Sequence, residues 1–188
     1  MRNALETNLP SQGLPLNQFW AIMEAPAQIK DHKLPAQEKA LNRALEKLSD
    51  EELIAFKITY ESVQKFAFRW DLWAAVYLAA GGCGDDSFIY FCNWLIGRGE
   101  LAFYKSISNP DSMADFDLKN DFGEACSCEW DVLPSIIWDK RHPNGPDLYD
   151  LLPEPTISSD GPAGEPFPED DMDYFRLNFP RLHDKYMP

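Results

Sequence analysis

The sequence predicts an all-α protein: a compact helical bundle around a central helical hairpin, with a long irregular acidic segment at its C-terminal end. Three observations lead to this prediction. Apolar residues recur at steps of three and four over several stretches, which is the period of an amphipathic helix. No stretch alternates between apolar and polar residues over the length of a strand. Residues 141–169 are rich in proline and glycine without any period, which is typical of extended chain.

The hairpin is predicted from residues 69–99, which contain three of the six tryptophans and two of the four cysteines. Asp71 can cap a first helix, and Gly81 ends it because glycine adopts the left-handed conformation without a steric penalty. A second helix begins at the aspartate pair that starts with Asp85, since carboxylates suit the positive end of the helix dipole. It stops at Gly97. Both helices are apolar enough to form the centre of a core.

Three helices are predicted before the hairpin, and the first two lie before Ser49. Residues 16–24 carry apolar side chains on one side, and Pro26 ends this helix. Residues 35–48 follow as a second amphipathic helix, with Pro35 in its first turn, where proline is tolerated.

The best-supported helix begins at Ser49. Ser49 and Glu52 form a capping box, and one apolar seam then continues as far as Trp70. This helix is expected to run into the hairpin with at most a kink. After the hairpin, residues 100–107 form a further short helix.

The C-terminal part is predicted to be less regular. A short helix or turn starts at Asp111, and a helix over 123–132 follows, limited by Pro134. A last short helix begins within 169–173, and Pro180 bends or ends it.

Residues 69–99 read RWDLWAAVYLAAGGCGDDSFIYFCNWLIGRG, with FWAIME upstream at 19–24 and FPRL downstream at 179–182. This pattern resembles the signature of a bacterial family of small helical proteins, a domain of unknown function, over about residues 16–182. The family label implies no activity. Relatives that act as immunity proteins of polymorphic bacterial toxins (Rhs and type VI) imply that this chain is a toxin inhibitor.

The length of 188 residues favours one domain. Residues 1–14 are polar and predict a flexible arm. Residues 15–188 form a single helical domain, in which 15–108 supply the core helices and 109–188 form an acidic half that wraps around them.

The charge is concentrated in the C-terminal half. The net charge is −14, and residues 109–188 hold 18 acidic and 6 basic residues, a net of −12. Such a surface repels nucleic acid and anionic membranes and attracts a basic protein. Solubility alone is an equally good explanation of the charge. Without a signal peptide or a long apolar run, the sequence predicts a cytoplasmic protein.

Motifs of catalysis are missing. The sequence has no G-x-S-x-G, H-E-x-x-H, P-loop or G-x-G-x-x-G pattern, so we expect no enzymatic activity and no cofactor. Asp85 and Asp86 fit helix capping better than a metal site. Cys126 and Cys128 lack the spacing of a zinc site, and Cys83 and Cys92 are expected to be reduced thiols in the core.

The leading hypothesis is therefore a non-catalytic immunity protein that binds the active site of a basic toxin domain, forming a heterodimer. An ADP-ribosyltransferase or a nuclease would have the basic cleft that the charge requires. Carboxylates are expected to contact its lysines and arginines, and exposed aromatic residues to act as buried anchors. The predicted partner-binding residues are Asp111, Asp115, Phe116, Asp117, Asp121, Phe122, Glu124, Glu165, Phe167, Glu169, Asp170, Asp171, Asp173 and Tyr174.

Two alternatives remain open. The first is a small enzyme or regulatory domain that binds a metal or another ligand at the Gly81–Asp86 turn, with Cys83 nearby. The second is an intracellular scaffold or oligomerisation module.

Overall fold

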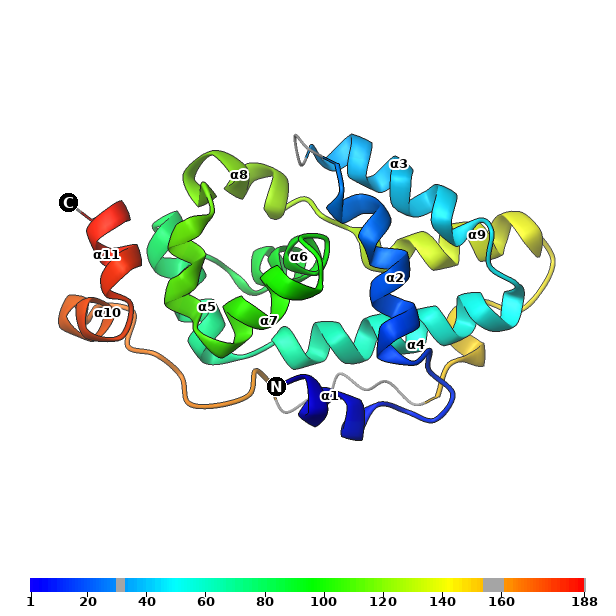
Figure 1. Ribbon diagram of the computed structural model, residues 1–188, viewed down its shortest axis with the longest axis horizontal. Helices are drawn as coiled ribbons and strands as arrows, with labels where there is room; N and C mark the ends of the chain where they lie inside the picture. The colour runs from blue at the N-terminus through cyan, green and yellow to red at the C-terminus, as the bar shows by residue number, and fades with distance from the viewer. Residues whose placement is uncertain (30–32, 154–160, 188) are drawn as a thin grey trace.

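A computed structural model describes residues 1–29, 33–153 and 161–187, and these form helices and no β-strand (Figure 1). The all-α prediction is confirmed. The α-helices are α1 (Arg2–Asn8), α2 (Leu16–Ala27), α3 (Leu34–Leu45), α4 (Asp50–Ala67), α5 (Trp70–Ala80), α6 (Asp85–Ile96), α7 (Glu100–Ser108), α8 (Leu118–Ala125), α9 (Leu133–Arg141), α10 (Met172–Asn178) and α11 (Pro180–Tyr186). Three 3-10 helices are η1 (Pro110–Asp115), η2 (Trp130–Val132) and η3 (Leu148–Leu151).

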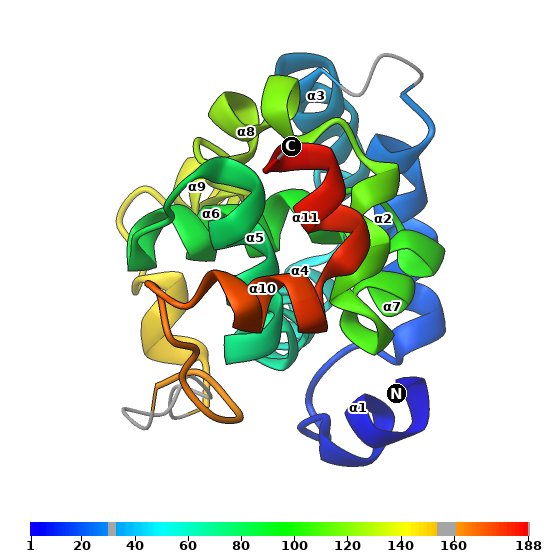
Figure 2. The ribbon, with the colours of Figure 1, turned by 90° about the vertical axis from the view of Figure 1, so that its left-hand side faces the viewer.

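The helices surround α4, the longest, which extends along the lower part of the molecule, and α6, which is seen end-on near the centre (Figure 1). At one end α2 packs closely against α3, and α9 contacts α3 and α4. At the other end α10 and α11 lie against α5 (Figure 2). Within the described residues, no helix combines the length and the apolar character needed to cross a membrane.

Helix α4 begins as the sequence predicts. The Ser49 hydroxyl accepts a hydrogen bond from the Glu52 amide at 3.2 Å, and the Glu52 carboxylate accepts one from the Ser49 amide at 2.8 Å. These two bonds satisfy amides that would otherwise lack partners at the helix start. The predicted seam is buried over Leu53, Phe56, Tyr60, Val63 and Ala67.

The turn between α5 and α6 also matches its prediction. Gly81 has a φ of 71° and ends α5 in the left-handed region. The rings of Trp73 and Phe88 stack beside the turn, 4.9 Å apart. Away from this turn the two helices pack chiefly against other elements: α5 against α11 and α8, and α6 against α8, α4 and α7.

Three prolines occupy positions other than those expected. Pro26 lies inside the last turn of α2, and its carbonyl accepts a hydrogen bond from Gln37 at 3.1 Å. Pro134 and Pro180 lie in the first turns of α9 and α11, so they begin helices instead of ending them. The first turn tolerates proline because an amide there has no partner within the helix.

Three predicted helices have other bounds in the structure. The helix expected over 35–48 is α3, which already ends at Leu45. The helix expected over 123–132 is replaced by α8 and η2, because Leu118 and Ala125 form a buried stripe that starts earlier. Helix α4 ends at Ala67 and does not continue into α5. Phe68 and Arg69 form a non-helical link between the two helices. Their backbone pairs with Ala163 instead: the Ala163 amide donates to the Phe68 carbonyl, and the Ala163 carbonyl accepts from the Trp70 amide, each at 3.0 Å.

Residues 1–14, for which the sequence predicts a flexible arm, contain α1. Leu5 and Leu14 are buried, and the Leu14 amide donates to the Ala55 carbonyl at 3.1 Å. The predicted wrapping segment 141–169 contains η3 and then extended chain from residue 161. Its part over 154–160 lies outside the described residues.

Candidate partner-binding surface

The structure divides the predicted partner-binding residues into two groups. The first, residues 111–124, lies in η1, in α8 and in the connection between them, beside α7 and α11. The second, residues 165–174, lies in the extended chain that leads into α10 and in the first turns of that helix.

In the first group, Asp111 serves the fold. Its side chain is buried, with the residue 7% exposed. Its two carboxylate oxygens accept hydrogen bonds from the backbone amides of Arg181, at 3.2 Å, and Leu182, at 3.0 Å. These amides belong to the first turn of α11, where a carboxylate is favoured by both unpaired N–H groups and the helix dipole. Asp111 therefore holds α11 against η1.

Other acids of this group also pair within the chain. Asp115 forms ion pairs with Lys105, at 2.6 Å, and with Arg181. The hydrogen bonds from Lys105 and Arg181 lower the pKa of Asp115 to about 2. Its partner Arg181 has its pKa raised by the same contact. Solvent weakens these two ion pairs, because the side chains of Lys105, Arg181 and Asp115 all remain partly exposed.

Acidic residues along α8 also pair with basic residues of this chain. Asp121 pairs with Arg98 at 3.0 Å, and Glu124 pairs with Lys33 at 3.3 Å. Asp117 is exposed and accepts a hydrogen bond from the Asn120 side chain at 2.6 Å. Four of the five carboxylates of the first group are thus engaged in contacts between elements of this chain.

The predicted aromatic anchors pack mainly on the core. Phe116 contacts the edge of Trp94 with ring centroids 5.6 Å apart, and Phe122 is half-buried against the core. Phe167 is 9% exposed, and Tyr174 is half-buried with its ring 5.5 Å from that of Phe175. Burial of aromatic surface explains these positions, since each large ring removed from water stabilises the fold.

The second group forms a surface that we call the acidic strap, residues 165–173. It has five carboxylates and no lysine or arginine. All five residues are exposed: Glu165, Glu169, Asp170, Asp171 and Asp173. A shallow depression of about 600 Å³ lies over Pro168–Asp173.

Contacts with α5 and a helix cap hold the acidic strap in place. The Phe167 ring lies 6.0 Å from Trp70 and 5.3 Å from Tyr77, between centroids. The Tyr77 hydroxyl donates to Glu169 at 3.1 Å, and this hydrogen bond raises the pKa of Tyr77. Asp171 caps α10 by accepting from the Tyr174 amide at 3.0 Å. The carboxylates are therefore presented on a backbone held in place by packing and by a helix cap.

The Gly81–Asp86 turn does not gather a ligand set. Asp85 and Asp86 are exposed, and the Asp85 carboxylate accepts the amide of Asp86 at 3.0 Å. Among the described residues, no three histidine, cysteine or acidic side chains are grouped so that they could hold a metal ion. Burial raises the pKa of the Cys83 thiol to about 12, which keeps it protonated and unreactive at neutral pH.

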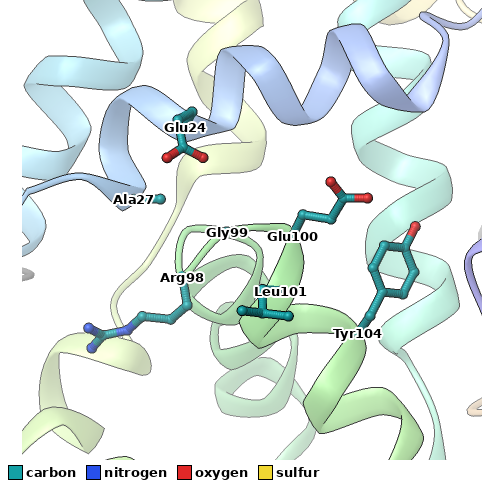
Figure 3. Close-up of a pocket in the computed structure, with 7 residues that line it drawn as sticks. All are labelled: Glu24, Ala27, Arg98, Gly99, Glu100, Leu101 and Tyr104. Carbon is teal, nitrogen blue, oxygen red and sulfur yellow. The ribbon is translucent and has the colours of Figure 1, made fainter.

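An open groove of about 550 Å³ lies between the end of α2 and the start of α7 (Figure 3). Glu24 and Ala27 come from α2, and Glu100, Leu101 and Tyr104 come from α7. Arg98 contributes to the lining, but its guanidinium points away from Leu101 (Figure 3). That guanidinium lies 4.0 Å from the Trp94 ring and pairs with Asp121. The sequence reasoning missed this groove, because α2 and α7 are about 75 residues apart along the chain.

Residues 16–137 match the model of the DUF4240 family, which is described as a protein of unknown function. The chain belongs to this family. No curated protein and no solved structure matches it. The family region of this DUF4240 protein includes α2 to α8 and the groove, whereas the acidic strap, α10 and α11 lie beyond it.

A buried polar network lies inside the DUF4240 region and was also missed. The Asn93 side chain is fully buried and accepts hydrogen bonds from Gln64, at 2.6 Å, and from the Tyr60 hydroxyl, at 3.2 Å. It donates to the Cys128 carbonyl and to the Asp131 carboxylate, both at 2.8 Å. These bonds join α4, α6 and η2. The only signal in the sequence is the position of polar side chains on otherwise apolar helix faces.

Lys57 extends this network. It is 2% exposed, and its ammonium donates to the Asp131 carbonyl at 2.8 Å and pairs with Glu61 at 3.2 Å. It also lies 4.9 Å from the centre of the Tyr149 ring. A buried ammonium requires such partners, because its desolvation is otherwise costly. We assign this network to the stability of the fold, since each of its groups finds a partner inside the chain.

Proposed function

We propose that this DUF4240 protein is a non-catalytic binding protein: a cytoplasmic immunity protein that holds a basic toxin domain. One observation carries the proposal. The acidic strap displays five exposed carboxylates on a backbone anchored by Phe167 and by the cap of α10. Among the described residues only Asp173 of these five forms an ion pair, with Arg176 at 3.0 Å. A surface of this kind is complementary to a cationic protein and is ordered before the partner arrives, which lowers the entropic cost of binding.

Contacts within the chain reduce the number of carboxylates that we propose for direct contact with the partner. Asp111, Asp115, Asp121 and Glu124 are paired within the chain, so they contribute to the overall negative field more than to direct contacts. The direct contacts are assigned to the acidic strap. Opposite charges accelerate encounter and set the orientation, and occlusion of the partner's cleft follows from the bulk of the helical body.

An ADP-ribosyltransferase toxin is the partner that we propose, because basic residues in a cleft that binds the anionic cofactor NAD would be complementary to the acidic strap. A nuclease would share this property. In either case the carboxylates of the acidic strap would occupy positions that phosphate groups take in the substrate complex, so binding and inhibition would be the same event.

The proposal predicts a gene for a basic toxin domain beside the gene of this protein, and that domain is the partner used in the test. Glu165→Lys combined with Asp170→Lys reverses two exposed charges, and neither carboxylate has a hydrogen bond among the described residues. We expect at least about tenfold weaker binding by calorimetry, which corresponds to about 1.4 kcal/mol, and loss of protection when the toxin is co-expressed.

The matched control is Asp139→Lys combined with Asp150→Lys. Both residues are exposed and lie outside the acidic strap, so the net charge changes by the same amount. The control should keep nearly wild-type affinity at moderate salt. Equal weakening by the two double variants would reduce the effect to net charge, and unchanged binding by the strap variant would refute the proposed surface.

A further inference from the structure

The groove between α2 and α7 is lined by an apolar side chain, Leu101, that does not pack in the core. Leu101 is 85% exposed, the largest value among the exposed large apolar side chains of the described residues. Its neighbours on the same helix, Phe103 and Ile107, are buried. Helical periodicity places Leu101 on the opposite face of α7, where its exposed side chain lines the groove (Figure 3).

The groove is hollow because its floor consists of small residues. Gly99 precedes α7 with a φ of 87°, and a Cβ at this position would lie 3.2 Å from the Cβ of Ala27. Glycine and alanine therefore allow the start of α7 to approach the end of α2 closely. The Leu101 and Tyr104 side chains border this floor on the α7 side (Figure 3).

Two carboxylates border the groove on its two helices. Glu100 already binds a guanidinium of this chain, because Arg2 of α1 pairs with it at 2.6 Å. Glu24 is exposed, and its carboxylate accepts a hydrogen bond from the Gln28 side chain at 3.1 Å. It forms no ion pair among the described residues. Figure 3 shows the Glu24 carboxylate directed toward the turn at Gly99.

We propose that this groove docks a segment of a partner protein in which a lysine or arginine adjoins an apolar side chain. Leu101 and the Tyr104 ring would cover the apolar part, and Glu24 would pair with the cation. The pairing of Arg2 with Glu100 is an example of the same recognition within this chain. Charge complementarity selects a basic partner over an acidic one. The proposal does not rest on the acidic strap, which lies on other elements.

A defined peptide probe tests the proposal by NMR on the full chain. A synthetic peptide of alternating lysine and leucine should shift the amide signals of Gly99, Leu101 and Tyr104. Leu101→Ser should weaken this binding at least about fivefold, and Glu24→Gln should weaken it and reduce its salt dependence. Both side chains are exposed, so these variants keep the fold. Leu177→Ser, at a 71% exposed leucine on α10, is the control and should leave the affinity unchanged.

Two further probes decide the source of the ligand. A glutamate–leucine peptide of equal length and the free polyamine spermidine should each leave the groove signals unchanged. Shifts of the same size with spermidine would indicate a site for free cations and overturn docking of a protein segment. Shifts confined to the acidic strap would overturn the groove as well. The Glu165→Lys and Asp170→Lys variant should retain the groove shifts, which separates this proposal from the proposed function.

Discussion

Gly97, at the end of α6, shows how one missing side chain positions a large ring. A Cβ at this position would lie 2.2 Å from Cζ3 and 2.6 Å from Cη2 of the Trp130 ring. Trp130 is 1% exposed, so its ring has little room to move away. The close contact lets η2 pack directly on the end of α6, next to the network around Asn93.

Gly97→Ala is therefore expected to destabilise the protein by about 1–3 kcal/mol, the usual cost of adding a methyl group to a packed core. Urea denaturation followed by circular dichroism measures the change. Gly123→Ala is the matched control, because a Cβ there meets no atom within 4 Å and the residue lies within α8. It should stabilise by up to about 1 kcal/mol, since alanine favours helix over glycine. Equal effects of the two variants would contradict the tight contact with Trp130.

At the scale of elements, α7, η1 and α11 are held together by charged groups. Asp111 binds the first turn of α11, and Asp115 bridges Lys105 of α7 and Arg181 of α11. The two aspartates are four residues apart, and their partners in α11 lie about 70 residues further along the chain. An acidic segment that the sequence predicts to be a binding surface thus partly stabilises the packing of α7 and α11 on η1.

This arrangement predicts a dependence on pH. The pKa of Asp115 falls from 3.8 to about 2 on folding, because Lys105 and Arg181 donate hydrogen bonds to the carboxylate. A lowered folded pKa stabilises the native state above the unfolded value, and this contribution disappears as the pH falls from about 4 toward about 2. Asp115→Asn should therefore reduce stability at neutral pH and have a shrinking effect through that range.

Urea unfolding of the wild type and of Asp115→Asn at several pH values measures this loss. Asp139→Asn, at an exposed position on α9, is the reference and should show little effect at any of these pH values. A difference between wild type and Asp115→Asn that stayed constant down to pH 2 would show that the carboxylate charge is not what ties α11 to η1 and α7.

The same elements show what the sequence could and could not predict. The capping box at Ser49 and the left-handed Gly81 depend on neighbours within a few residues, and both were predicted correctly. The roles of Asp111 and Phe167 depend on partners 70 to 100 residues away, so local patterns assigned them to a binding surface. Proline was misjudged for a related reason, because Pro134 can either end one helix or begin the next.

At the scale of the molecule, the family region shares one core with residues 161–187, which we call the C-terminal extension. The DUF4240 match ends at residue 137, yet Phe175, Phe179 and Leu182 are buried against the family helices. Figure 2 shows α10 and α11 lying across the end of the molecule that α5 forms. The extension therefore has two sides: its inner side completes the core, and its outer side includes part of the acidic strap.

Removal of residues 161–188 tests the contribution of the inner side. Each large apolar side chain lost from the core withdraws about 1.5–3 kcal/mol, so several together approach the 5–15 kcal/mol that stabilises a typical domain. We expect the truncated chain to melt at least about 10 °C lower than the full chain and to bind a dye specific for exposed apolar surface. The strap variant Glu165→Lys with Asp170→Lys is the control, since it changes only the outer side and should melt near the wild type. A truncated chain that melted like the full chain would mean that the family region folds independently, and the burial of Phe175, Phe179 and Leu182 would then reflect docking of a separable segment.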